Sequence, residues 1–271
     1  MRFIRFLDAA GATRYGLPGD DDHAERLAGD PYGGLTATGE RVAIARLLAP
    51  IQPVNIFGIG LNYRAHARET GAEVPASPVV FMKPTTALNH PGAPIVLPAA
   101  CEHGPEVDYE AELAVVIGRT ARNVSEADAL DFVLGYTCAN DVSARRWQKR
   151  GGGGQWVRGK SFDGFCPLGP HLVTADEIPD PQALTVRSRL NGRVMQEQPT
   201  ADMLFPVRRL IAELSRDLTL LPGTLILTGT PEGVGFTREP PVFLQPGDDI
   251  VIEIDGIGRL ANPVRAHGQN T

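Results

Sequence analysis

The sequence predicts an α+β fold in which β-strands dominate. Most apolar segments of the 271-residue chain are short and rich in β-branched residues, as strands are, and helical periodicity is rare. The 30 glycines and 23 prolines imply many turns between these segments. Short strands with few helices indicate a mostly β domain.

Residues 1–50 are expected to form a small N-terminal domain, and residues 51–271 a larger one. A chain of 271 residues is long enough for both. The small domain begins with a predicted strand over Arg2–Leu7 and contains a polar loop over Gly19–Gly34. A proline, Pro50, marks the junction between the two domains.

The larger domain is expected to contain many strands with a few helical segments between them. Strands are predicted at Val54–Gly60, Val79–Pro84, Gly135–Asp141, Leu184–Leu190, Arg193–Gln196, Leu225–Thr230, Asp249–Ile254 and Arg259–Val264. The pair Asn191–Gly192 is typical of a hairpin turn. Helical segments are predicted at Asn62–Thr70, Ala129–Val133, Val142–Lys149 and Phe205–Leu220.

The bulk properties exclude several classes of function. The 26 basic and 32 acidic residues give a net charge of −6, which disfavours a nucleic-acid partner. The three cysteines are widely spaced and form no CxxC pair, which argues against a disulfide framework and for a reducing compartment. The N-terminus lacks the apolar core of a signal peptide, and no apolar run has membrane-spanning length. We therefore expect a cytoplasmic protein without a membrane partner.

The segment Glu106–Gly118 combines alternating acidic residues with a β-branched apolar run that is typical of a buried strand. Because side chains two apart on a strand share a face, Asp108, Glu110 and Glu112 are predicted to lie together. Like charges so close are costly unless a cation lies among them, and a divalent metal ion would satisfy them. The alternative is an edge strand whose acidic residues prevent pairing with other chains.

A histidine and a glutamate, His66 and Glu69, are three residues apart in a predicted helical segment. This spacing places them on one face, where Glu69 would orient His66 and raise its basicity. That arrangement is typical of general base catalysis. The alternative is a solvated surface histidine with an incidental salt bridge.

Another candidate, Asp141, ends an apolar strand, and Arg145 and Gln148 follow on roughly the same side of the predicted helix. A strand-end carboxylate followed by a cation and an amide fits a metal site with an anion clamp beside it. The alternative is a helix N-cap with surface polar residues.

The stretch Gly154–Ser161 has the spacing of a phosphate-binding P-loop. Such a loop needs a buried strand before it and a helix after it, whose first amides hold the phosphates. Here a polar stretch precedes it, and Phe162–Pro170 is rich in glycine and proline. The context therefore disfavours nucleotide binding.

Taken in order, these motifs resemble the fumarylacetoacetate hydrolase family over about Ile56–Val264. The motifs that carry the resemblance are Gly60–Tyr63 with His66, Val107–Leu113, Asn140–Arg145, Gly159–Asp163, Cys166–Pro170 and Leu227–Gly235. Within them, Lys160 belongs to a motif of the family, which removes the P-loop interpretation.

The resemblance implies a mixed β-roll catalytic domain, a homodimer and one divalent ion, usually Mg²⁺, with Mn²⁺ and Ca²⁺ as alternatives. The positions implied as metal ligands are Glu110, Glu112 and Asp141. The positions implied as catalytic are His66, Glu69 and Lys160, and those implied as substrate-binding are Arg145, Gln148 and Thr230. The chain departs from the family at Arg146, where members often carry aspartate, so the local charge near the distal end of the substrate differs.

The expected function is metal-dependent hydrolysis of a C–C bond in a 2,4-diketo acid, which releases pyruvate and a carboxylic acid. In this mechanism His66 activates water, and the metal ion stabilises the pyruvate enolate. The alternative on the same site is oxaloacetate decarboxylation or keto–enol tautomerisation, which needs no attacking water. A catalytically inert binding protein is a third hypothesis, which the presence of all these residues disfavours.

Overall fold

The structure, a computed structural model, describes residues 1–19 and 22–268. Strands dominate it and the helices are short, so the mostly β fold predicted from the sequence is confirmed. Among the described residues, no helix has the length and apolar character needed to cross a membrane.

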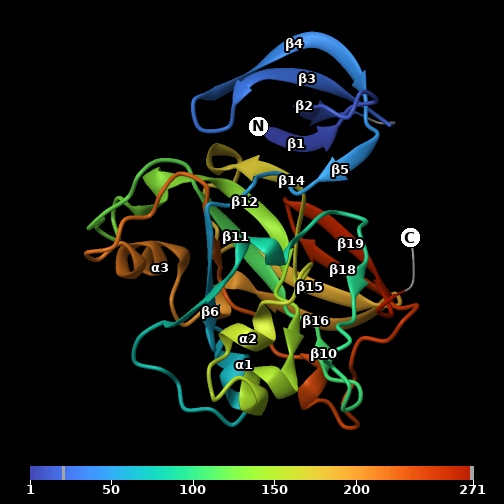
Figure 1. Ribbon diagram of the computed structural model, residues 1–271. Coiled ribbons are helices and arrows are strands. Elements are labelled where there is room, and N and C mark those ends of the chain that lie inside the picture. Colours follow the sequence, from blue (N-terminus) through green and yellow to red (C-terminus); the bar gives the residue numbers. More distant parts are fainter. Residues whose placement is uncertain (20–21, 269–271) are drawn as a thin grey trace.

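The largest sheet extends from the N-terminal region at the top of Figure 1 through the centre of the molecule. It contains β1 (Arg2–Leu7), β2 (Thr13–Pro18), β3 (His23–Asp30), β4 (Gly34–Ala43), β5 (Arg46–Leu48), β6 (Asn55–Gly60), β7 (Val79–Lys83), β8 (Leu88–Asn89), β11 (Ala111–Ile117), β12 (Val133–Asn140), β14 (Cys166–Thr174) and β17 (Thr224–Leu227). The strand order is β4-β3-β2-β1-β14-β12-β11-β17-β6-β7, with β5 paired to β1 and β8 to β14. The sheet is mixed, because β17 runs parallel to β6 and β8 parallel to β14.

A second sheet packs against the central strands of the first. It has the order β16 (Arg193–Pro199), β15 (Thr185–Leu190), β18 (Asp249–Ile254), β19 (Gly258–Arg265) and β9 (Ile95–Val96). Leu113 and Val115 of β11 face this sheet, whereas Ala114 and Val116 pack into a separate cluster. Since β11 is buried on both faces, its sequence is continuously apolar from Leu113 to Ile117 rather than alternating.

The helical segments are few and brief. The α-helices are α1 (Arg64–Glu69), α2 (Val157–Lys160) and α3 (Val207–Leu214), and a π-helical turn spans Trp147–Gly151. Turns of 3₁₀-helix lie at Thr85–Ala87, Ala129–Phe132, Ala175–Glu177, Thr200–Asp202 and Gly235–Thr237. The amphipathic helix predicted over Phe205–Leu220 is thus shorter than expected, and Leu218 beyond its end is 41% exposed.

The helix predicted over Val142–Lys149 begins too early, because the helical turn starts only at Arg145. Its first part is β13 (Ser143–Ala144), which pairs with β10 (Val107–Asp108). The backbone N–H of Val142 donates to a carbonyl outside this segment, and that of Arg145 donates to the carbonyl of Glu106. These tertiary hydrogen bonds replace the first ones that a helix would make, and only the π-helical turn follows.

The polar loop predicted over Gly19–Gly34 is also wrong, because most of it belongs to β3. That strand pairs with β4, which is exposed along nearly its whole length. Only Ala24 and Leu27 of β3 are buried, so its sequence lacks the apolar alternation that identifies a strand. Asp20 and Asp21 lie outside the described residues. The division of the chain at residue 50 stays a prediction.

Candidate active site

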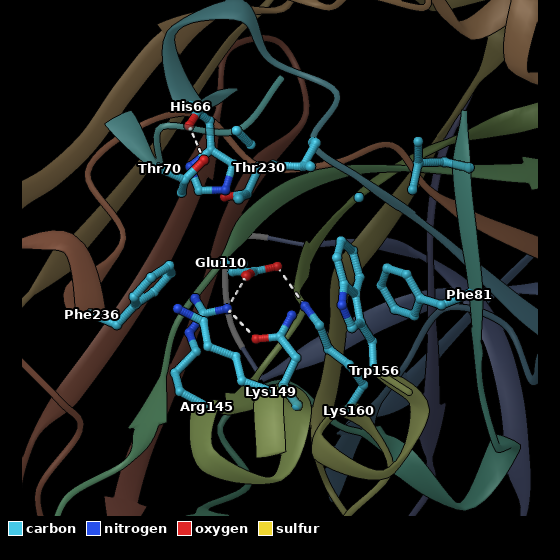
Figure 2. Close-up of a pocket in the computed structure, with 15 residues that line it drawn as sticks. His66, Thr70, Phe81, Glu110, Arg145, Lys149, Trp156, Lys160, Thr230 and Phe236 are labelled. Atoms are coloured by element: carbon cyan, nitrogen blue, oxygen red, sulfur yellow. Dashed lines mark hydrogen bonds and ion pairs between the residues drawn. The ribbon is translucent and has the colours of Figure 1, made fainter. Parts of the chain in front are cut away.

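One pocket, of about 250 Å³, combines charged side chains with aromatic walls. In Figure 2, Glu110 lies between Arg145 and Lys160, and His66 lies on the far side with Thr230. Aromatic rings flank this polar centre on two sides. They are Phe81 and Trp156 on one side and Phe236 on the other.

Three buried carboxylates meet beside this pocket. One oxygen from each of Glu110, Glu112 and Asp141 lies within 4.8 Å of the other two. Antiparallel pairing of β11 with β12 explains the meeting, because it pairs Ala111 with Asn140, and the N–H of Asp141 donates to the Glu110 carbonyl over 2.9 Å. Residues far apart in the sequence therefore lie at the same end of two neighbouring strands.

Two lysines neutralise part of this cluster. The ammonium group of Lys160 donates to Glu110 at 2.7 Å and to Asp141 at 2.6 Å, and that of Lys83 donates to Asp141 at 2.5 Å. Burial opposes the ionisation of Glu110, but the cations of Lys160 and Arg145 outweigh it and lower the pKa of that carboxyl. For Glu112, burial together with Asp141 and Glu110 raises the pKa well above its usual range.

The third carboxylate, Glu112, lacks a cationic partner within hydrogen-bonding distance among the described residues. Its hydrogen-bond donor there is the backbone N–H of Gly229, at 2.6 Å. A divalent cation would supply the missing positive charge, and three carboxylates are the hard oxygen ligands that Mg²⁺, Mn²⁺ and Ca²⁺ prefer. The cluster could therefore hold such an ion.

The expectation that Asp108 shares a strand face with Glu110 and Glu112 is wrong. The strand breaks between β10 and β11, and Asp108 turns toward Arg145, whose guanidinium donates to it at 2.7 and 2.9 Å. Backbone N–H groups of Tyr109, Gly235 and Phe236 also donate to this carboxylate. With its hydrogen bonds satisfied, Asp108 holds Arg145 rather than joining the carboxylate cluster.

The histidine and glutamate lie as their spacing predicts. Helix α1 presents both, and His66 Nδ1 is 3.0 Å from a Glu69 oxygen. The other oxygen of Glu69 accepts hydrogen bonds from the Gly233 N–H and the Thr237 hydroxyl. Both side chains are mostly buried, so the surface-histidine alternative is wrong. Nδ1 faces Glu69, which leaves Nε2 as the nitrogen available to a ligand in the pocket.

The side chains expected to face a substrate all line the pocket. Arg145 donates to Glu110 at 2.6 Å and to the Gln148 oxygen at 3.0 Å, so the NH₂ group of Gln148 is its available donor. The Thr230 hydroxyl accepts from Gln196 and donates to the Ala111 carbonyl. Because Arg145 is already paired with two carboxylates, it is less free to clamp an anion than its sequence position suggests.

Sequence reasoning missed Lys83, which is 2% exposed and contacts Asp141 directly. A signal was present: inward and outward positions alternate along β7, and Lys83 shares the inward face with Phe81. A lysine at an inward strand position needs a carboxylate partner.

The residue at which the chain departs from the family, Arg146, lies outside the pocket, where its guanidinium donates to Glu106 and the Ala100 carbonyl.

The glycine before Lys160 is needed for packing. A Cβ at Gly159 would lie 2.4 Å from the backbone nitrogen of Gln148 and 2.7 Å from the Ala144 carbonyl oxygen. We expect Gly159→Ala to lower the free energy of unfolding by about 1–3 kcal/mol, since backbone atoms must move. It should also lower catalytic activity by displacing Lys160.

Denaturant unfolding measures the first effect. Gly151→Ala is the matched control, because its new Cβ would meet the side chain of Trp147 at 3.0 Å rather than backbone. Equal unfolding free energies for wild type and Gly159→Ala would contradict the packing argument.

Comparison with known families now identifies the chain. Residues 55–265 match the family described as fumarylacetoacetate (FAA) hydrolase C-terminal. The chain belongs to the fumarylacetoacetate hydrolase family. Residues 1–50 match a second family, described as Rv2993c-like, N-terminal.

Relatives within the fumarylacetoacetate hydrolase family carry several enzyme names. The mitochondrial oxaloacetate tautomerase of Xenopus laevis is 51% identical over 219 residues, which cover 80% of this chain and 68% of the frog protein. The crystal structure of a 5-carboxymethyl-2-hydroxymuconate delta-isomerase from Mycobacterium smegmatis is similar with a TM-score of 0.84 at 42% identity, over 98% of this chain and all of that one. The structure of a fumarylacetoacetate hydrolase from Exiguobacterium antarcticum has a TM-score of 0.83 at 36% identity, over 98% of this chain and all of that one. These similarities confirm the expected fold, and the chain belongs to a family of enzymes.

The cytoplasmic location expected from the sequence is wrong. The frog relative and its bovine and human counterparts are named as mitochondrial. Free cysteines indicate a reducing compartment but do not distinguish the cytoplasm from a mitochondrion. The expected homodimer stays a prediction.

Proposed function

We propose that this protein is a divalent-metal-dependent keto–enol tautomerase of oxaloacetate. The observation that carries the proposal is that His66, held by Glu69, lines the same pocket as Glu110 of the buried carboxylate cluster. Tautomerisation needs one proton carrier and stabilisation of an enolate, and this pocket contains candidates for both. The 51% identity to an oxaloacetate tautomerase supports the same reaction.

In the proposed site, Glu110, Glu112 and Asp141 hold the divalent ion. When bound, the ion supplies Lewis-acid stabilisation of the negative charge that develops on the 2-oxo oxygen. Lys83, Arg145 and Lys160 neutralise carboxylates around it, so that an anionic substrate meets a site with net positive charge. The four carboxylates of Asp108 and the cluster carry one charge more than these three cations, and a divalent ion reverses the sign.

The proton transfer is assigned to His66. Its Nε2 takes a proton from C3, the C3–H electron pair becomes the C2=C3 bond, and the carbonyl π pair moves to the 2-oxo oxygen. Return of the proton to that oxygen gives the enol, so no water is consumed. Glu69 keeps the imidazole oriented through the 3.0 Å contact at Nδ1. Gln148 and Thr230 are assigned to substrate binding, and Lys160 to stabilising the oxyanion.

Hydrolysis of a 2,4-diketo acid, as predicted from the sequence, is the second candidate. The same His66–Glu69 pair has the geometry to activate a water molecule, and a fumarylacetoacetate hydrolase is 36% identical. We place it second because the tautomerase relative is considerably more similar.

The test follows three reactions with the same purified protein, with Mg²⁺ and with EDTA. We expect Mg²⁺-dependent loss of the ultraviolet absorbance of enol-oxaloacetate above the uncatalysed rate. Pyruvate release from a panel of acylpyruvates measures the competing hydrolysis, and pyruvate release from oxaloacetate measures decarboxylation. Metal-dependent release from an acylpyruvate without faster tautomerisation would replace the proposal with the hydrolase.

A further inference from the structure

The pocket has one cationic side chain that the proposed reaction does not use, Lys149. It follows Gln148 in the π-helical turn, lines the same pocket and is exposed at its lip. The other two lysine or arginine side chains of the pocket, Arg145 and Lys160, each donate to two carboxylates. No carboxylate within residues 1–19 and 22–268 forms an ion pair with Lys149.

An aromatic ring lies beside this ammonium group. The Nζ atom lies 4.0 Å from the centroid of Phe236, and the Arg145 guanidinium lies 4.4 Å from the same centroid. Partial burial and the nearby cations of Arg145 and Arg150 lower the pKa of Lys149. An anion bound beside Lys149 would relieve the repulsion between its ammonium group and these two cations.

We propose that Lys149 binds the distal carboxylate of a dicarboxylic substrate. The proposal rests on the proposed function, in which the C1 carboxylate and the 2-oxo oxygen lie at the carboxylate cluster. A second carboxylate at C4 then needs a partner elsewhere in the pocket. The side chains of Phe81 and Trp156 are uncharged rings, and Arg145 and Lys160 are already paired with carboxylates. Lys149 is therefore the cationic side chain of the pocket that is available to the second carboxylate.

This contact would make the pocket selective for 2-oxo acids that carry a second carboxylate. A 2-oxo acid without the distal carboxylate would leave Lys149 unpaired, and a substrate with it would gain a charged hydrogen bond. Gln148 and Lys149 are neighbours in the π-helical turn, and both line the pocket. Gln148 would then bind the reacting end of the substrate, and Lys149 would bind its distal carboxylate.

The experiment compares two unreactive 2-hydroxy acids, malate and lactate, which differ by the distal carboxylate. Calorimetry with the Mg²⁺-loaded full chain gives the dissociation constant of each acid. We expect malate to bind wild type roughly 10-fold or more tightly than lactate, since a hydrogen bond to a charged group has about that effect. Lys149→Met should abolish this preference by weakening malate alone, and Lys149→Arg should keep most of it.

The matched control is Arg150→Met, which deletes the same charge one residue along, outside the pocket. Equal affinities of wild type for malate and lactate, a preference that survives in Lys149→Met, or no malate binding at millimolar concentration would each overturn the proposal. The binding ratio does not depend on turnover. Failure of the tautomerase assay with an intact malate preference would therefore reject the reaction and keep the role of Lys149.

Discussion

Replacing Glu112 by glutamine is expected to abolish metal-dependent activity without destabilising the metal-free protein. The substitution removes one of the three proposed carboxylate ligands, and the loss in kcat/KM should be on the order of 10³-fold, as for other electrostatic groups at a developing oxyanion. Without metal, burial together with the charges of Asp141 and Glu110 raises the pKa of Glu112, so its ionised form is unfavourable in the folded protein. The neutral amide cannot ionise, so the variant in EDTA should unfold at the wild-type temperature or above.

Thermal unfolding with and without Mg²⁺ separates these effects. Mg²⁺ at about 100 times its dissociation constant should stabilise wild type by roughly 3 kcal/mol, which raises its melting temperature by about 5–10 °C. Glu112→Gln should show little of this shift. Glu232→Gln, the same chemical change on an exposed residue of the loop after Gly229, is the control and should behave as wild type. A full Mg²⁺ shift in Glu112→Gln would contradict the assignment of this residue as a ligand.

Replacing His66 by alanine is expected to lower kcat for tautomerisation by about 10²–10⁴-fold, the usual contribution of a general acid–base group. The imidazole lies across the pocket from Glu110 of the carboxylate cluster, so malate affinity and the Mg²⁺-induced shift in melting temperature should change little. Glu69→Gln should have a smaller effect, because it leaves the imidazole present but alters its orientation.

Hydrogen–deuterium exchange at C3 of oxaloacetate in D₂O gives a second measure of His66. Wild type should accelerate this exchange and His66→Ala should not, whereas the exposed His103→Ala should match wild type. Wild-type exchange in His66→Ala would show that another group carries the proton.

Much of the candidate site could be predicted from the sequence, because its signals are local. The buried strand β11 follows from its apolar run, and the His66–Glu69 contact follows from helical spacing. Pairing of β11 with β12 then places Glu110 and Asp141 at adjacent strand ends. For these residues, the positions predicted from sequence spacing agree with those in the structure.

Other features depend on contacts between distant segments. Asp108 has the sequence pattern of a metal ligand, but Arg145 and the amides of Gly235 and Phe236 turn it away. The segment after Asp141 has helical character, but the carbonyls of Glu106 and Phe165 accept its first N–H groups. In both cases a partner far along the chain outweighs the local preference.

The sequence by itself determined the family, the mostly β class and the chemical types of the candidate site residues. The tertiary structure alone decided which charges are already paired and which are available. Lys83 proved to be a buried partner of Asp141, Arg145 is shared between Asp108 and Glu110, and Lys149 has no carboxylate partner among the described residues. The physical reason is that the effect of a charge depends on distances and burial across the fold, which residue spacing along one strand or helix does not encode.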